Sequence, residues 1–84
     1  GHDKSSIVFA IDNKPGSLYS AIELLAKSGI NMTKIESRPM KKELGKYVFF
    51  IDIDGNIDDA SIYFALDKVR QNTFFYKFLG SYNY

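Results

Sequence analysis

The sequence predicts one small α+β domain whose elements follow the order strand, helix, strand, strand, helix, strand. Three observations support this prediction. Apolar residues alternate with period two in several stretches, two other stretches have a helical period, and glycine or proline marks most boundaries. A chain of 84 residues, 45% of them hydrophobic, is long enough to bury a single core.

The first expected strand covers residues 5–11. Every second residue in it is apolar, which is typical of a half-buried strand: Ile7, Phe9 and Ile11. Helical periodicity begins at Ser17, and one stripe carries Leu18, Ala21, Ile22 and Leu25. On the opposite side Glu23 and Lys27 stand four residues apart, and Gly29 is a favourable place for the helix to end.

Residues 30–39 form the second expected strand. Pro39 closes it, because proline cannot donate a ladder hydrogen bond. We expect Ile30 and Met32 on one side of this strand. The other side is expected to carry Asn31, Thr33 and Ile35.

A polar connector over residues 40–45, with Gly45 at its expected positive φ, leads to the third strand at residues 46–54. One face of this strand is apolar and consists of Tyr47, Phe49, Ile51 and Ile53. The other face is mixed and consists of Val48, Phe50, Asp52 and Asp54. The alternation makes this the clearest strand of the chain.

The second helix is expected to follow this strand. Asn56 or Asp58 would cap its N-terminus, and Asp59 would favour the positive end of its dipole. Its inner stripe comprises Ile62, Leu66 and Val69, widened by Tyr63. Residues 73–79 form the last expected strand, with aromatic side chains on both faces, and residues 80–84 an expected tail.

With right-handed crossovers this order predicts the ferredoxin-like fold, a four-stranded antiparallel sheet with both helices on one face. Two helices cannot cover all of its aromatic residues, of which the relevant ones are Phe50, Phe74, Tyr76 and Phe78. We therefore expect an apolar patch and self-association. Residues 1–4 are expected to be an expression scar or a disordered start, and residues 5–84 the domain.

Composition narrows the possible functions. Eleven basic and ten acidic residues give a net charge of +1, so no strong field favours nucleic acid or an anionic membrane. The lack of cysteine excludes a disulfide scaffold and a thiolate zinc site and fits a reducing compartment, so we expect a cytoplasmic protein. The longest apolar run, residues 47–51, is too short to span a bilayer.

The chain offers little catalytic chemistry. Its single histidine, His2, lies in the expected scar, and no carboxylate pair stands out, so we expect no enzyme activity, no catalytic residue and no cofactor. The aspartates that could suggest a cation site are Asp52, Asp54, Asp58 and Asp59. They are better explained as solvent-facing strand positions and a helix start, and the segment lacks the terminal glutamate of a calcium loop, so we expect no metal.

Two segments could carry binding chemistry. In the turn Pro15-Gly16-Ser17-Leu18, Gly16 lets a ligand approach the backbone, and the amides that open the helix suit a carboxylate. A plain connecting turn explains the same residues. Glu36-Ser37-Arg38-Pro39 is expected to place its acid and its base on opposite strand faces, and by itself it is explained by a solvated edge with an exposed ion pair.

Three segments together resemble the C-terminal ACT regulatory domain of prephenate dehydratase. They are Pro15 to Tyr19, the run from Gly29 to Pro39 that ends in Glu-Ser-Arg-Pro, and the closing Leu79-Gly80-Ser81-Tyr82. The Glu-Ser-Arg-Pro motif is shared with the regulatory domains of aromatic amino acid hydroxylases such as phenylalanine hydroxylase, whereas Leu-Gly-Ser-Tyr favours the dehydratase. The resemblance covers about residues 5–82.

This resemblance implies a ferredoxin-like module that pairs and binds an amino acid at the interface of the pair. In prephenate dehydratase the ligand is L-phenylalanine, the end-product inhibitor. The expected partners are therefore L-phenylalanine, a second copy in a homodimer or tetramer, and a catalytic domain elsewhere in the parent chain, with no nucleic acid and no membrane.

The resemblance also implies the site residues. The family's Gly-Ala-Leu turn matches Gly16, Ser17 and Leu18 after Pro15, with Ser17 where alanine is usual, and its strand contacts match Asn31, Met32 and Thr33. The turn amides would meet the ligand carboxylate, and the Asn31 amide oxygen would hold the ammonium. The apolar wall, partly across the subunit interface, would come from Leu18, Met32 and Ile35. The expected frame of the site consists of Glu36, Ser37, Arg38 and Pro39.

Two alternatives remain open. An RNA-recognition domain shares this element order, and residues 45–50 faintly resemble its aromatic RNA-stacking motif. The glycine–aromatic spacing, the following Asp52 and Asp54, and the balanced charge argue against it. The other alternative is an ACT dimerisation module that binds no ligand.

Overall fold

The computed structural model describes residues 3–12, 16–40 and 46–83. Its elements are β1 (Asp3–Asp12), α1 (Ser17–Lys27), β2 (Met32–Pro39), β3 (Lys46–Asp54), α2 (Ala60–Gln71) and β4 (Phe75–Asn83). The predicted order of strands and helices is confirmed. The expected positive φ of Gly45, the residue Pro15, and the expected scar residues Gly1 and His2 lie outside the described residues.

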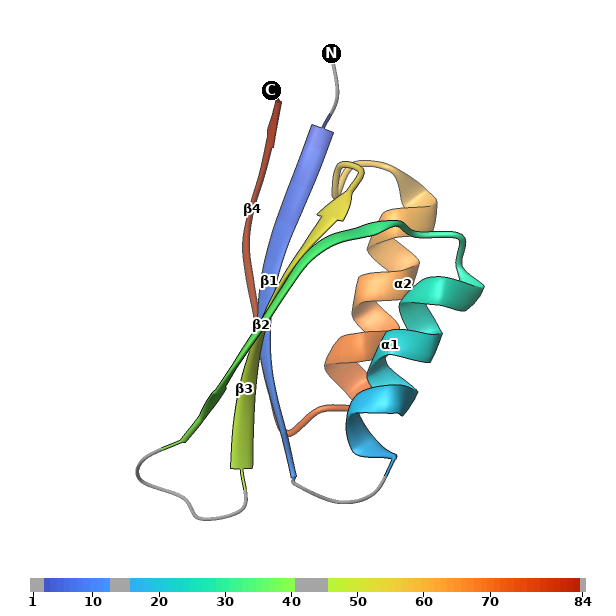
Figure 1. Cartoon of the computed structure of the whole chain (residues 1–84). Coiled ribbons are helices and arrows are strands. Elements are labelled where there is room, and N and C mark those ends of the chain that lie inside the picture. The colour runs from blue at the N-terminus through green and yellow to red at the C-terminus, as the bar shows by residue number, and fades with distance from the viewer. Residues whose placement is uncertain (1–2, 13–15, 41–45, 84) are drawn as a thin grey trace.

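The four strands form one antiparallel sheet in the order β2-β3-β1-β4, so β2 and β4 are its edges. Both helices pack on the same face of this sheet, and the other face is open (Figure 1). The predicted ferredoxin-like fold is therefore confirmed. Neither helix in the described part of the chain is long and apolar enough to cross a bilayer.

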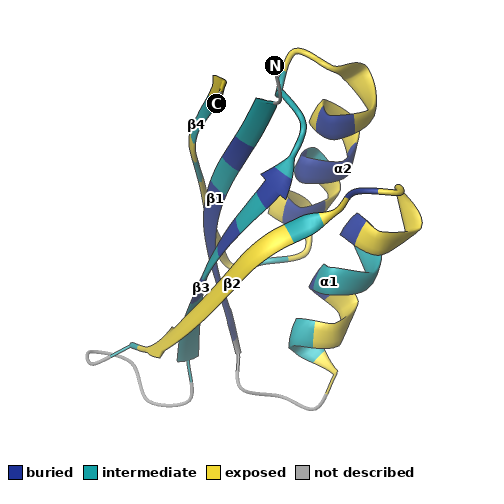
Figure 2. Cartoon of the chain, turned by 45° about the horizontal axis from the view of Figure 1, so that its top comes forward, coloured by how far each residue is buried: buried dark blue, intermediate teal, exposed yellow. Residues whose placement is uncertain are grey.

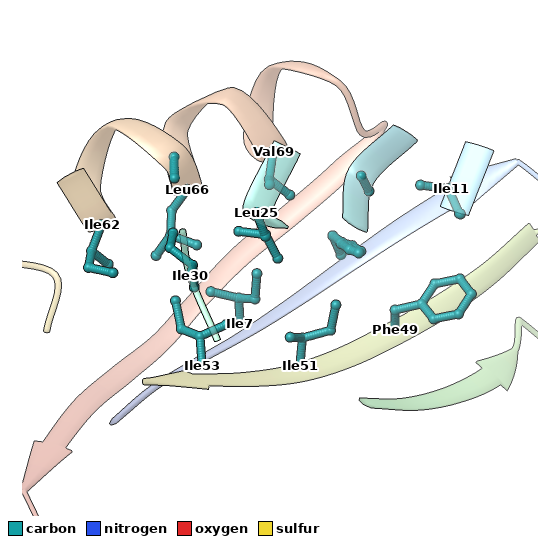
Figure 3. Close-up of a cluster of buried hydrophobic side chains, with 13 residues drawn as sticks. Ile7, Ile11, Leu25, Ile30, Phe49, Ile51, Ile53, Ile62, Leu66 and Val69 are labelled. Atoms are coloured by element: carbon teal, nitrogen blue, oxygen red, sulfur yellow. The ribbon is translucent and has the colours of Figure 1, made fainter. Parts of the chain in front are cut away.

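The core lies between the sheet and the two helices, where the labelled side chains converge (Figure 3). Register places Ile7 of β1 opposite Ile51 of β3 and Phe9 opposite Phe49, with 5.8 Å between the two ring centroids. The predicted apolar face of β3 and the stripes of both helices are largely confirmed by their burial. Two residues depart from the prediction. Ile22 is only partly buried and Leu24 packs against the core in its place, and Tyr63 is 54% exposed.

The helix ends follow local backbone chemistry. Gly16 precedes α1 with a φ of 84°, and Gly29 follows it with a φ of 74°, which is the left-handed region that glycine accepts. The N-cap of α2 is Asp59, whose carboxylate accepts the Ser61 N–H at 3.0 Å. Neither predicted cap is correct. The Asn56 side chain instead accepts the Asp58 N–H at 2.9 Å and forms a turn before the helix.

A bulge near the start of β2 changes which side chains share a face. Met32 pairs with Ile53, but Lys34 pairs with Asp52, so Thr33 is an extra residue in the ladder. The regular strand begins at Met32 rather than at residue 30. Because one extra residue reverses the alternation, Ile35 lies on the same face as Met32, and the prediction that it lies on the opposite face is wrong.

A second irregularity lies where β4 pairs with β1. Ile7 pairs with Phe78 and Ser6 pairs with Gly80, which leaves Leu79 as an extra residue. Gly80 has a φ of 146° at this point. Beyond it the chain returns to the ladder and pairs with β1 as far as residue 83, so most of the expected tail is strand and β1 begins at residue 3 rather than 5.

The returning end of β4 holds the β3–α2 connection in place. The hydroxyl of the fully buried Ser5 donates to the Gly55 carbonyl at 2.7 Å, so the Ser81 hydroxyl must donate across the 2.7 Å that separates the two serine oxygens. The Ser81 oxygen in turn accepts the Ile57 N–H at 3.1 Å. These three bonds join β1, β4 and the connection, and they satisfy buried polar groups.

The four aromatic residues expected to form an apolar patch are not all exposed. Tyr76 and Phe78 pack partly buried against the core, and the Arg38 guanidinium lies 5.7 Å from the centroid of the Phe50 ring. Phe74 is half exposed beneath the Lys46 ammonium, 4.5 Å from the ring centroid. The other large exposed apolar residues are Tyr19, Ile35, Tyr63, Phe64, Phe75, Leu79 and Tyr82. Self-association stays a prediction.

Candidate ligand site

The predicted site residues form two groups in the structure. The turn half consists of Gly16, Ser17 and Leu18 at the start of α1, and the strand half consists of Asn31, Met32 and Thr33 at the start of β2. Pro15, which the sequence adds to the turn half, lies outside the described residues. Ile35 and the Glu-Ser-Arg-Pro residues follow further along β2.

The turn half presents backbone N–H groups that have no partner within the helix, at the N-terminus of α1. The first helical hydrogen bond runs from the Ser20 N–H to the Gly16 carbonyl at 2.9 Å, so the preceding amides have no partner within the helix. Among the described residues no side chain caps them, and the first turn of α1 contains no acidic residue. A Cβ built on Gly16 meets nothing within 4 Å, so the approach to these amides is open from that side. This arrangement suits an anion.

The nearest acidic residue along α1 is tied to other side chains. Glu23 forms an ion pair with Lys27, four residues further along the helix, at 3.1 Å. Hydrogen bonds from Lys27 and then Tyr19 lower the pKa of Glu23, and the hydrogen bond with Glu23 raises the pKa of Tyr19. The Glu23 carboxylate is therefore paired with Lys27, on the side away from the amides of the turn half.

The strand half is held by the end of β3. The Asp54 N–H donates to the Asn31 carbonyl at 2.9 Å, and the Asn31 side-chain nitrogen donates to Asp54 Oδ2 at 2.9 Å. The Thr33 hydroxyl lies 3.4 Å from the Asp52 carbonyl, and Met32 packs partly buried against the core. The strand half thus combines an exposed amide with an apolar side chain.

The Glu-Ser-Arg-Pro motif lies on the exposed edge strand β2, most of which is coloured as exposed in Figure 2. Arg38 and Glu36 form an ion pair of 3.1 Å. The prediction that they lie on opposite faces is wrong, because residues two apart in a strand share a face. Register places both on the open face of the sheet, whereas Ser37 and Pro39 lie on the helix-facing side.

One chain does not bring the two halves together. They lie at opposite ends of α1, whose 11 residues span roughly 16 Å at about 1.5 Å per residue. In Figure 1 the N-terminus of α1 lies level with the far end of β2, while its C-terminus leads back to the start of β2. A ligand the size of one amino acid cannot touch both halves of the same chain.

Two surface hollows lie elsewhere, and no residue of either half lines them. One of about 250 Å³ lies between α2 and β4 and is lined by Ile57, Tyr63, Leu66, Asp67, Arg70, Tyr76 and Phe78. Burial raises the pKa of Tyr76 there to about 12, and Asp67 acts in the same direction against Arg70. The other, of about 410 Å³, is lined by Ser6, Leu79, Gly80, Ser81 and Tyr82.

Sequence reasoning missed Asp54 as a neighbour of the site. The sequence places this residue on the mixed face of β3, as a candidate cation ligand and as an acidic neighbour that disfavours RNA, whereas its carboxylate accepts a hydrogen bond from the Asn31 side chain. Asp52 accepts the Ser6 hydroxyl at 2.6 Å, and Asp59 caps α2, so these aspartates have separate structural partners. The contact with Asn31 follows from the β2–β3 register. That register cannot be predicted from the sequence, because the bulge at Thr33 shifts it.

Comparison with known proteins places these observations in a family. Residues 5–71 match the model of the ACT domain. Over 82 residues the chain is 49% identical to a bifunctional chorismate mutase/prephenate dehydratase of Aquifex aeolicus, covering 98% of this chain and 23% of that protein. The chain thus spans about a quarter of the length of this relative.

Solved structures agree in fold. The prephenate dehydratase of Arthrobacter aurescens in complex with L-Phe superposes with a TM-score of 0.90 at 36% identity, over 98% of this chain and 27% of that one. GqqA, described as a quorum-quenching acylase, superposes with a TM-score of 0.91 at 29% identity, over 98% of this chain and 42% of that one. The resemblance derived from the sequence motifs is confirmed, and the chain belongs to the ACT domain family.

Proposed function

We propose that this ACT domain is the regulatory domain of a prephenate dehydratase and senses L-phenylalanine for feedback inhibition. The observation that carries the proposal is the match of 98% of the chain to a relative named for that activity, together with the 36% identity to a prephenate dehydratase solved with L-Phe. In this proposal the domain itself is not catalytic, and the catalytic domain occupies another part of the parent chain.

The geometry of a single chain supports a site built by two copies. If two copies pair antiparallel along β2, the start of one β2 lies beside the far end of the other. The N-terminus of α1 is level with that far end (Figure 1). Antiparallel pairing therefore brings the turn half of one copy toward the strand half of the other, and a twofold axis produces two such sites.

The chemistry of the two halves fits an α-amino acid. The free amides of the turn half would bind the carboxylate, and the Asn31 amide oxygen would accept the ammonium. Leu18 and Met32 would supply apolar surface for the side chain. Ile35 would add to it, since the bulge places it on the helix-facing side with Met32, where it is 47% exposed. The Glu36–Arg38 ion pair would help to hold the edge strand β2 in the conformation that the site needs.

A ligand that touches two copies also explains regulation. It binds the paired state and not the separate copies, so it shifts the equilibrium toward pairing by the difference between its affinities for the two states. The parent enzyme would read this shift as inhibition if the paired state disfavours its active conformation.

The RNA-recognition alternative finds little support in the orientation of β3. Tyr47 and Phe49 face the helices, so only Phe50 of these aromatic residues reaches the open face. There the Arg38 guanidinium lies beside its ring, and Glu36 pairs with it in the ladder. A single covered ring does not form a base-stacking surface.

Calorimetry on the 84-residue chain with L-Phe, L-Tyr and L-Trp tests the proposal. We expect L-Phe to bind most tightly, with one ligand per copy. Sedimentation at the same concentrations should show that L-Phe increases the fraction of pairs. If none of the three amino acids bound at millimolar concentration, the proposal that the domain senses L-Phe would be overturned. The alternative of a dimerisation module that binds no ligand would then remain.

A further inference from the structure

We infer that Asp54 is a positioning residue that orients the Asn31 amide and thereby makes the proposed site select ligands with a free α-ammonium. This inference rests on the proposed function, because it concerns the strand half of the same site. It assigns a role to a residue on β3 that none of the sequence motifs contains.

The two bonds between Asn31 and Asp54 are reciprocal. Asp54 donates its N–H to the Asn31 carbonyl at 2.9 Å, and its carboxylate accepts from the Asn31 side-chain nitrogen at 2.9 Å. The first bond fixes the backbone just before the bulge of β2. The second fixes the rotation of the side-chain amide, which is otherwise exposed. Together they hold both ends of this asparagine.

The direction of the amide decides what the site can bind. Asparagine carries two donors on its nitrogen and an acceptor on its oxygen, at opposite corners of one planar group. With the nitrogen directed at Asp54, the oxygen points the other way. An ammonium needs an acceptor and is repelled by a donor, so an amide free to rotate would lose much of this preference.

Asp54 acts by orientation rather than by its charge. Lys4 lies directly opposite it in the β1–β3 ladder, so a basic residue accompanies the carboxylate. The turn half offers donors for a carboxylate at the other end of the ligand, so the two ends of the site have complementary polarity. The chemical class that fits both ends is a zwitterionic α-amino acid, and a 2-oxo acid or a desamino acid fits only one.

The test compares L-Phe with 3-phenylpropanoate, which keeps the ring and the carboxylate but lacks the ammonium. Dissociation constants are measured by calorimetry for the unmodified chain, Asp54→Ala and Asp54→Asn, with the exposed Asp58→Ala as control. We expect Asp54→Ala to weaken L-Phe by about tenfold, as for the loss of a hydrogen bond to a charged group, and to leave 3-phenylpropanoate nearly unchanged. Asp54→Asn retains an acceptor and should restore most of the affinity.

Three results would overturn the inference. Unchanged L-Phe affinity in Asp54→Ala would show that the amide needs no support. Equal weakening of both compounds would show a general structural defect. If Asp54→Asn lost as much as Asp54→Ala, the carboxylate would be acting on the ligand through its charge.

A measurement without ligand separates this inference from the proposed function. The side-chain NH₂ group of Asn31 should show slow hydrogen exchange and a downfield shift of the proton that is bonded to Asp54. Both features should be lost in Asp54→Ala and persist in Asp58→Ala. If the unmodified chain binds neither compound, the proposed function fails, and these resonances still show whether Asp54 holds the amide. Free-amide behaviour in the unmodified chain would overturn the inference by itself.

Discussion

The two edge strands of the sheet, β2 and β4, differ in how many of their side chains are buried or bonded within the chain itself. Seven of the eight residues of β2 are exposed. In β4, exposed residues alternate with partly buried ones that pack under α2 or bind β1 and the β3–α2 connection. The difference indicates that β4 is committed to the stability of the domain, whereas β2 is available for contacts outside its own chain.

The two family motifs that lie on these strands, Leu-Gly-Ser-Tyr on β4 and Glu-Ser-Arg-Pro on β2, differ in the same way. Leu-Gly-Ser-Tyr on β4 produces a bulge that brings Ser81 to the buried Ser5 and to the Ile57 amide. Glu-Ser-Arg-Pro on β2 produces an exposed ion pair, and such pairs stabilise a folded protein by about 1 kcal/mol at most. Stability therefore explains the first motif and does not explain the second.

The largest expected effect concerns the turn half of the proposed site. Gly16→Val should abolish detectable L-Phe binding in calorimetry, because valine blocks the approach to the amides and resists a φ of 84°. The strain should cost about 1–2 kcal/mol of unfolding free energy. Gly80→Val is the matched control at β4, since Gly80 also has a positive φ and open space around a Cβ. It should lower stability and leave L-Phe affinity intact; retained binding in Gly16→Val would refute the placement of the carboxylate.

The next effect should appear at β4. Ser81→Ala removes the group that serves both Ser5 and the Ile57 N–H, and it should lower the unfolding free energy by about 1–3 kcal/mol in urea titrations. The exposed Ser28→Ala, which removes one bond to the Leu24 carbonyl, should change it by about 0.5 kcal/mol or less. Equal effects of the two substitutions would contradict the assignment of β4 to stability.

A pair of charge substitutions compares the edges directly. Ile35 on β2 and Leu79 on β4 are 47% and 50% exposed, so neither loses much burial within the chain. Ile35→Glu should weaken L-Phe binding and ligand-dependent pairing by about tenfold, the equivalent of losing roughly 1.4 kcal/mol of apolar contact at the proposed interface. Leu79→Glu should change neither in calorimetry and sedimentation. The reverse outcome would move the interface to β4.

The smallest effect is a dependence of stability on high pH. Burial raises the pKa of Tyr76 from 10.0 to about 12, so the folded state holds this proton more tightly than the unfolded state. The contribution of Tyr76 to stability is complete below pH 10 and is lost as the pH rises through 12. Ultraviolet titration of tyrosine ionisation, compared with Tyr76→Phe, should show one group of high pKa missing from the variant. Identical titration curves above pH 10 would contradict the burial of this phenol.

Much of the fold could be predicted from local patterns. The bounds of β3 and α1, the inner stripe of α2 and the order of elements follow from periodicities of 2.0 and 3.6 residues and from the glycines that end segments. These signals are local, since each side chain's direction depends on its own backbone conformation. The family motifs also named the two halves of the proposed site.

Only the tertiary structure decided the remaining features, because they depend on pairing between distant segments. The bulges at Thr33 and Leu79 arise where two ladders must stay in register, and each reverses the faces of the residues beyond it. The contact between Asp54 and Asn31 joins residues 23 positions apart. The separation of the two halves along α1 likewise depends on the path of the chain. The sequence determined which residues the proposed site contains, and the tertiary structure decided that one copy cannot assemble them, since a rigid helix keeps the two halves apart.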